Sequence, residues 1–243
     1  MLEVSGTESE LRKNLVEACR FLYAANAAGD GTGGHLSVRL DRTRILIKPR
    51  QVSWHWLEPK DLILIDFQGQ RIDCETEERT PVREWPIHSQ IYASRPDVKC
   101  VLHAHPSSST LMAALNISVE PFDQDCSLFV DQLPVLDNAG VSVCTSELGD
   151  TVARALGRAN ALLLKHHGSV VVGAEIPDVC VRAQKLEKIA ETMLRAASAA
   201  ALPIMTESEK NEIIQARVAL SPSRSLSSDE NKWELLRNYY LPR

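Results

Sequence analysis

The sequence lacks the features of several large protein classes. Of its 243 residues six are cysteines, and no two of them form a Cys-x-x-Cys pair. This argues against a thiolate zinc site or a dense disulfide framework, so we expect reduced thiols. No apolar run approaches the roughly 20 residues that span a bilayer, and no basic region followed by an apolar stretch opens the chain. We therefore expect a cytoplasmic protein that does not enter membranes.

Clusters of basic charge are also missing. The formal net charge is −5, and lysines and arginines are interspersed with acidic residues along the chain. Without a basic run that could follow a phosphate backbone, nucleic acid is not an expected partner. The 44% hydrophobic and 24% charged content instead fits one compact domain, which we place at residues 1–220. Residues 221–243 are expected to form a flexible serine-rich connector and an aromatic helix that packs on the domain or on a neighbouring subunit.

Periodicity predicts alternating helices and strands. Apolar positions at three-and-four spacing and helix-forming composition predict helices over residues 8–28, 86–95, 107–115, 148–156, 178–201 and 229–240. Short β-rich or apolar runs predict strands within 31–39, 44–48, 61–66, 100–105, 161–167 and 170–172, with an extended segment over 135–143. This order predicts an α/β fold in which a mixed sheet is covered by helices on its faces.

Two histidines at a spacing of two are the first chemical signal. His103 and His105 lie on a predicted strand, so both imidazoles project from one face and can converge on one ion. A third imidazole would complete a catalytic site with one open position, and five histidines remain to supply it: His35, His55, His88, His166 and His167. His166 and His167 end a predicted strand on opposite faces, so at most one points at the pair, and periodicity does not say which.

A carboxylate accompanies these histidines. Pro86 fits the first position of a helix, which places Glu84 at the mouth of that helix. The alternative is that the histidines are ordinary hydrogen-bonded residues at strand ends. Glu84 and the His-His-Gly strand end strengthen the case for a metal site, and the spacing alone leaves that alternative open.

These residues belong to a set of short motifs in a characteristic order. The motifs are Gly33–Arg39, Ile47–Pro49, Leu57–Leu62, Glu84–His88, His103–His105 and His167–Gly168. In order and spacing they resemble the class II aldolase/adducin family, which includes fuculose-phosphate and ribulose-phosphate aldolases and epimerases. The resemblance extends over most of the chain.

The resemblance implies a three-layer αβα sandwich with a central mixed, largely antiparallel sheet. It also implies a homo-oligomer, usually a tetramer, with active sites between subunits. His103, His105 and His167 are then the ligands of a divalent metal ion, zinc or manganese with Fe²⁺ as another option. Glu84 is then the acid/base or an additional ligand. The adducin branch is not enzymatic and looks unlike this chain, which has all three histidines and the glutamate.

The chain departs from the family's phosphate-binding elements. Gly34, His35 and Ser37 occupy the loop that holds the substrate phosphate in the aldolases, and we expect them to bind substrate here. Arg50 stands where a small hydroxyl residue is expected, and Val82-Arg83 replaces a pair of serines. A sugar phosphate is therefore disfavoured. Arginine's planar fork matches a carboxylate, so we expect Arg50 and Arg83 to bind a small carboxylate substrate, with surface salt bridges as the alternative.

The proton donor of the family is also missing. Aldolases of this family use a tyrosine beyond the His-x-His strand, and residues 119–125 contain none. Tyr239 or Tyr240 could replace it by covering a neighbouring site, although aromatic packing is the other role open to them. The cluster Trp54-His55-Trp56 suits a flat aromatic ring better than a polyol, and packing at a subunit interface is its alternative.

The leading hypothesis is a metal-dependent carbon–carbon lyase that decarboxylates a small hydroxylated aromatic acid. An aldolase or dehydratase acting on a non-phosphorylated hydroxy-carbonyl compound is the alternative within the same class. A non-haem Fe(II) oxygenase is an alternative from another class, because three histidines with open positions also suit Fe(II). A non-catalytic interaction module like adducin is the remaining one.

Overall fold

The computed structural model describes residues 7–50, 52–73, 79–137, 140–199, 206–209, 211–212, 215 and 227–241. Seven strands form one sheet in the order β3-β2-β1-β4-β7-β6-β5. They are β1 (His35–Arg39), β2 (Ile45–Ile47), β3 (Ile63–Ile65), β4 (Cys100–Ala104), β5 (Val135–Leu136), β6 (Ala161–Leu164) and β7 (Gly168–Gly173). Only the β5–β6 pair is parallel among these neighbours. The expected mixed, largely antiparallel sheet is confirmed.

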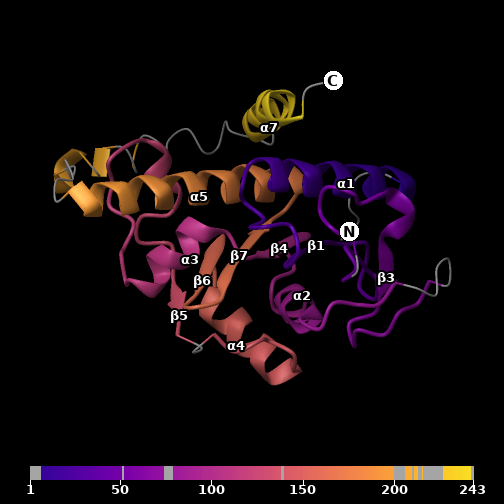
Figure 1. The fold of residues 1–243 in the computed structure, drawn as a ribbon. Helices are drawn as coiled ribbons and strands as arrows, with labels where there is room; N and C mark the ends of the chain where they lie inside the picture. The colour runs from indigo at the N-terminus through magenta and orange to yellow at the C-terminus, as the bar shows by residue number, and fades with distance from the viewer. Residues whose placement is uncertain are drawn as a thin grey trace.

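Helices cover both faces of the sheet. On one side lie α1 (Glu8–Ala24), α3 (Ser107–Ala114) and α5 (Ile176–Ala199), and on the other lie α2 (Trp85–Ser94) and α4 (Ser146–Leu156) (Figure 1). Two 3-10 turns, Pro59–Asp61 and Asp125–Leu128, were not predicted. The three layers confirm the αβα sandwich. Among the described residues, every helix is too short or too polar to serve as a membrane span.

Apart from β5, the strands are buried on both faces, which explains their continuous apolar runs. In β2, Ile45 and Ile47 join the core under α2 and α4, whereas Leu46 joins the core under α1 and α5. Strands covered on both sides do not alternate between apolar and polar residues. A polar side chain on such a strand therefore needs a hydrogen-bond partner, since burying it alone costs free energy. The polar residues His35 and Ser37 of β1 meet this requirement in the site described below.

Several element boundaries differ from the predictions. The strand predicted to reach His167 ends at Leu164, because a tight turn reverses the chain into β7 and places His166 in the left-handed region (φ 62°). Among the described residues of the extended segment predicted over 135–143, only 135 and 136 form a strand, β5. The predicted helix end at Ala201 and residues 221–226 of the predicted connector lie outside the described residues. The last helix begins at Ser227 rather than at Asp229, so residues 227–228 are helical and not part of a connector. The domain boundary at residue 220 stays a prediction.

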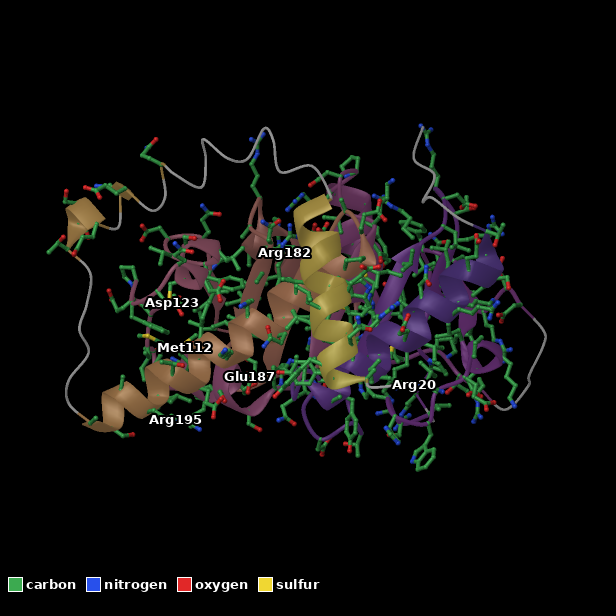
Figure 2. All side chains as sticks on the ribbon, turned by 90° about the horizontal axis from the view of Figure 1, so that it is seen from above. Arg20, Met112, Asp123, Arg182, Glu187 and Arg195 are labelled. Atoms are coloured by element: carbon green, nitrogen blue, oxygen red, sulfur yellow. The ribbon has the colours of Figure 1, made fainter. Side chains whose placement is uncertain are left out.

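The last helix, α7 (Ser227–Tyr240), lies on the outside of α1 and α5. Figure 2, seen from above, shows it crossing this outer helical layer. The rings of Trp233 and Tyr240 contact Phe21 edge-on, with centroids 4.9 and 5.5 Å away. An ion pair between Arg237 and Glu17 (3.4 Å) reinforces the contact. The aromatic tail therefore packs on its own chain.

Truncating this aromatic contact should weaken the fold. We expect Trp233→Ala to lower the free energy of unfolding by about 2 kcal/mol, less than for a fully buried ring because Trp233 is half-buried. Leu235, on the outer face of α7 with 72% of its surface exposed, is the matched control, and Leu235→Ala should stay within about 0.5 kcal/mol of the parent. Urea unfolding measures both, and equal losses would contradict the packing role.

Candidate metal centre

Four potential ligands converge at one end of the central strands. Glu84 precedes α2, His103 is in β4 and His105 directly follows it, and His167 is in the turn before β7. Their ligand atoms all lie within 4.8 Å of one another. Nε2 of His103 lies 3.1 Å from Nε2 of His105 and 3.4 Å from a Glu84 oxygen, and the other Glu84 oxygen lies 3.4 Å from Nε2 of His167. The structure thus brings together His103, His105, His167 and Glu84.

The spacing of these atoms fits a divalent metal ion. Tetrahedral ligands at zinc–nitrogen bond lengths of about 2.0–2.1 Å lie about 3.3 Å from one another. Nδ1 of His103 lies 3.0 Å from the carbonyl oxygen of Ser169 and donates its proton there, which leaves the lone pair of Nε2 facing the cluster. Histidines that bind a metal through one ring nitrogen typically donate the N–H of the other ring nitrogen to such an acceptor. The cluster is therefore able to hold an ion.

The charge states of the cluster also suit a cation. Burial opposes ionisation of Glu84, but the facing rings of His103, His167 and His35 outweigh burial and hold the pKa of Glu84 well below its ordinary value. Burial lowers the pKa of His105 to about 4. An ionised carboxylate and neutral imidazoles are the protonation states that metal ligands require.

Glycines permit the close approach of two loops to the histidines. A Cβ at Gly33 would lie 2.7 Å from Nδ1 of His105, and one at Gly34 would lie 2.7 Å from the carbonyl oxygen of His103. Gly34 also has a positive φ of 75°. A Cβ at Gly168 would lie 2.3 Å from the carbonyl oxygen of Ala104. Larger residues at these positions would displace the strand that carries the ligands.

A cavity of about 250 Å³ opens beside the cluster. Arg50 and Arg83 line it together with Gly34, His35, Glu84 and His105, so most of the residues predicted to bind substrate share one space. The remaining lining residues, none of which was predicted to bind substrate, are Thr32, Gly33, Val82, Ser142 and Cys144. Val143 between them donates its backbone N–H to Glu84 (2.8 Å), which fixes this segment against the carboxylate.

Ser37 does not line this cavity. Its side chain is fully buried, and its hydroxyl lies 2.6 Å from Nδ1 of His88 and 2.7 Å from the hydroxyl of Tyr92. Nε2 of His88 in turn lies 2.6 Å from Nδ1 of His35. Ser37 therefore contacts His88, which in turn contacts His35, and we do not retain Ser37 as a direct substrate ligand. Burial lowers the pKa of His35 to about 3 and that of His88 well below its ordinary value, so both rings are neutral.

The predicted aromatic cluster is split between the core and the surface. Trp54 is fully buried and donates its indole N–H to the carbonyl oxygen of Gly33 (2.7 Å), which holds the glycine loop. Trp56 is 74% exposed. Tyr240 lines a different cavity of about 550 Å³ beside α5, and Tyr239 is exposed. Neither the aromatic cluster nor the two tyrosines line the cavity next to the metal cluster.

A family model described as "Class II Aldolase and Adducin N-terminal domain" matches residues 13–194. The chain belongs to the class II aldolase and adducin family. This confirms the resemblance that the motifs indicated.

Two curated relatives illustrate the range of chemistry near this chain. The 5-methylthioribulose-1-phosphate/5-deoxyribulose-1-phosphate aldolase of Rhodospirillum rubrum is 29% identical over 210 residues, which cover 86% of this chain and 92% of that protein. The 3,4-dihydroxyphthalate decarboxylase of Terrabacter sp. is 28% identical over 205 residues, covering 81% and 85%. The named activities of both relatives are lyase reactions, on different substrates.

A solved structure supports the fold. The L-fuculose 1-phosphate aldolase from Glaciozyma antarctica PI12 aligns with a TM-score of 0.81 at 22% identity, covering 96% of this chain and 89% of that chain. The class II aldolase scaffold is therefore shared at this low identity.

Removing one ligand should abolish metal retention. We expect His103→Ala to weaken zinc affinity by more than about 100-fold. Removal of a residue that only hydrogen-bonds to a metal ligand already lowers metal affinity about 10- to 100-fold. His166→Asn is the matched control, because His166 is exposed and asparagine tolerates the left-handed backbone there. Elemental analysis after zinc loading and desalting measures the metal content. Equal zinc content in the two variants would contradict the assignment.

Proposed function

We propose that this chain is a metal-dependent carbon–carbon lyase that decarboxylates a small hydroxylated aromatic acid. The observation that carries the proposal is that Arg50 and Arg83 line the same cavity as Glu84 and His105. Two guanidinium groups at the rim of a potential metal site suit a carboxylate-bearing substrate. The similarity to a decarboxylase of a dihydroxylated aromatic acid supports this substrate class.

The two arginines have positions suited to capturing an anion. Arg83 immediately precedes Glu84 in the chain, so it lies next to the residue whose carboxylate faces the histidines. Arg50 lies just after β2, in a segment far from Arg83 in the sequence, and it lines the same cavity. The side chains of Arg50 and Arg83 are both exposed. No pair of serines remains before Glu84 to receive a phosphate. A substrate carboxylate held by this pair would lie beside the histidine cluster.

The cluster and Glu84 divide the chemistry. An ion held by His103, His105 and His167 would act as a Lewis acid towards the hydroxyl and carboxylate oxygens of the substrate. Glu84, whose carboxylate faces the histidines, would accept the proton of the substrate hydroxyl. The bond between the ring carbon and the carboxylate carbon then breaks, CO₂ leaves, and the electron pair stays with the ring. Glu84 returns its proton to that ring carbon, so atoms and charge balance.

An aldolase acting on a non-phosphorylated hydroxy-carbonyl compound is the second candidate. It is favoured by the similarity to a sugar-phosphate aldolase at nearly the same identity. The absence of tyrosine from residues 119–125 counts against it, because cleavage of the family type needs a proton donor there.

As for assembly, the family resemblance implies a tetramer with active sites between subunits, and we propose that arrangement here as well.

The proposal predicts metal-dependent CO₂ release from hydroxylated aromatic acids. On the best substrate of a panel, Arg50→Gln and Arg83→Gln should each raise KM roughly 10- to 100-fold, the effect of losing a charged hydrogen bond. Arg42→Gln, in the exposed turn between β1 and β2, is the control and should leave KM unchanged.

The same assays discriminate the alternatives. Retro-aldol activity on hydroxy-carbonyl compounds without CO₂ release from any acid would favour the aldolase. Oxygen consumption on adding Fe(II) and substrate would favour the oxygenase. Freshly purified and zinc-loaded protein that retains no metal would favour an interaction module.

A further inference from the structure

A buried carboxyl group on α5 caps the helix that follows the metal cluster. Glu187 of α5 is only 8% exposed (Figure 2). One of its carboxyl oxygens accepts the backbone N–H of Ser108 (2.7 Å), and the other accepts that of Ser109 (2.9 Å). These are the second and third residues of α3, which begins two residues after His105. Glu187 therefore does what the side chain of an N-cap residue does in most helices.

α3 has no capping side chain of its own. Its N-cap residue is Pro106, which has neither a backbone N–H nor a side-chain acceptor. The first N–H groups of a helix have no partner within the helix, and those of Ser107, Ser108 and Ser109 are in this position here. Among the described residues, the carboxyl group of Glu187 has no other hydrogen-bond partner and no basic side chain at ion-pair distance. Capping α3 is therefore the polar interaction that offsets the burial of this group.

The position of His105 depends on the helix that Glu187 caps. His105 lies between the end of β4 and the start of α3. The ring of His103 is fixed by the hydrogen bond from its Nδ1 atom to Ser169, whereas Nδ1 of His105 has no such partner among the described residues. The loop of Gly29 packs so closely that a Cβ there would lie 2.4 Å from the carbonyl oxygen of His105. The position of the His105 ring is thus set by its backbone, and Glu187 holds the helix that continues this backbone.

We propose that Glu187 is a positioning residue for the metal centre. By capping α3 it fixes the backbone where the chain leaves β4, and so it keeps Nε2 of His105 beside Nε2 of His103, 3.1 Å away. Glu187 does not line the cavity next to the cluster, so it acts only through α3. The proposal rests on the metal centre of the proposed function, and it is independent of the reaction catalysed there.

The same helix carries a matched control near its first turn. Asp178 is also 8% exposed, and one of its oxygens accepts two backbone N–H groups of the turn before α5, both at 3.1 Å. It packs against Gly173, which pairs with Cys100 at the start of β4, whereas the histidines lie at the other end of that strand. Removing either carboxyl group leaves two backbone N–H groups without an acceptor, so both changes should destabilise the fold similarly. Only the change at Glu187 adjoins the metal cluster.

Zinc affinity of the full-length protein, measured by competition with a chelator, tests the proposal without any assay of activity. We expect Glu187→Ala to weaken zinc affinity about 10-fold, the smaller end of the cost of removing a direct partner of a metal ligand, because Glu187 acts one step further away. Asp178→Ala should bind zinc as tightly as the parent. Glu187→Gln, which keeps one acceptor oxygen, gives the same comparison with a smaller loss if Glu187→Ala does not fold.

Two results would contradict this account in different ways. Parent-like zinc affinity in the Glu187 variants, together with a lower melting temperature, would show a purely structural cap and overturn the proposal. A parent protein that binds no zinc would refute the metal centre itself, and with it the proposed function.

A second substitution tests whether capping is the means by which Glu187 acts. Pro106 has an extended backbone (φ −70°, ψ 143°) that suits an N-cap residue, so Pro106→Ser would give α3 a hydroxyl acceptor of its own. We expect Pro106→Ser to restore zinc affinity when combined with Glu187→Ala, and to leave it unchanged when introduced alone. Recovery of thermal stability in the double variant without recovery of zinc affinity would overturn the proposal.

Discussion

The close approach of three imidazole nitrogens and one carboxylate is the constraint around which this protein is organised. His103 lies on the central strand β4, paired across the sheet with His35 of β1 and with Val170 of β7. Donor atoms 3.1–3.4 Å apart from one another are spaced so that one divalent cation can bind them together. Glycines at positions 33, 34 and 168 allow the flanking loops to approach this strand closely enough to complete the cluster.

Part of this site could be predicted from local rules. The two-residue period of a strand placed His103 and His105 on one face, and the proline at the start of α2 placed Glu84 at its mouth. The same rules did not identify the third histidine, because His166 and His167 lie in a turn where strand alternation does not apply. Only the order of motifs across the whole chain singled out His167.

Other features depend on contacts that no local pattern specifies. The expected role of Ser37 came from the family's loop, yet the buried position of its hydroxyl follows from the packing of α2 on β1. The spacing of four between Glu84, His88 and Tyr92 forms a polar stripe on an otherwise apolar helix. The sequence analysis predicted no role for His88 or Tyr92 in this stripe. The meeting of Arg50 and Arg83 in one cavity required the three-dimensional fold.

The comparisons with known proteins establish the fold, but they do not determine the substrate, which depends on the residues around the cavity. Relatives of nearly equal identity are named as an aldolase and as a decarboxylase, so membership of the family does not decide the reaction. What differs from the sugar-phosphate pattern here are the residues that would touch the substrate, above all the two arginines. Substrate class therefore follows from side chains around the cavity, whereas the histidine cluster is the part expected to persist across reactions.

Anomalous X-ray scattering from crystals of the zinc-loaded protein, recorded on both sides of the zinc absorption edge, tests the metal site most directly. We expect one anomalous peak at about 2.0–2.1 Å from Nε2 of each of His103, His105 and His167. The absence of a peak among these three histidines, or an ion held elsewhere in the fold, would contradict the assignment of this cluster as the metal centre.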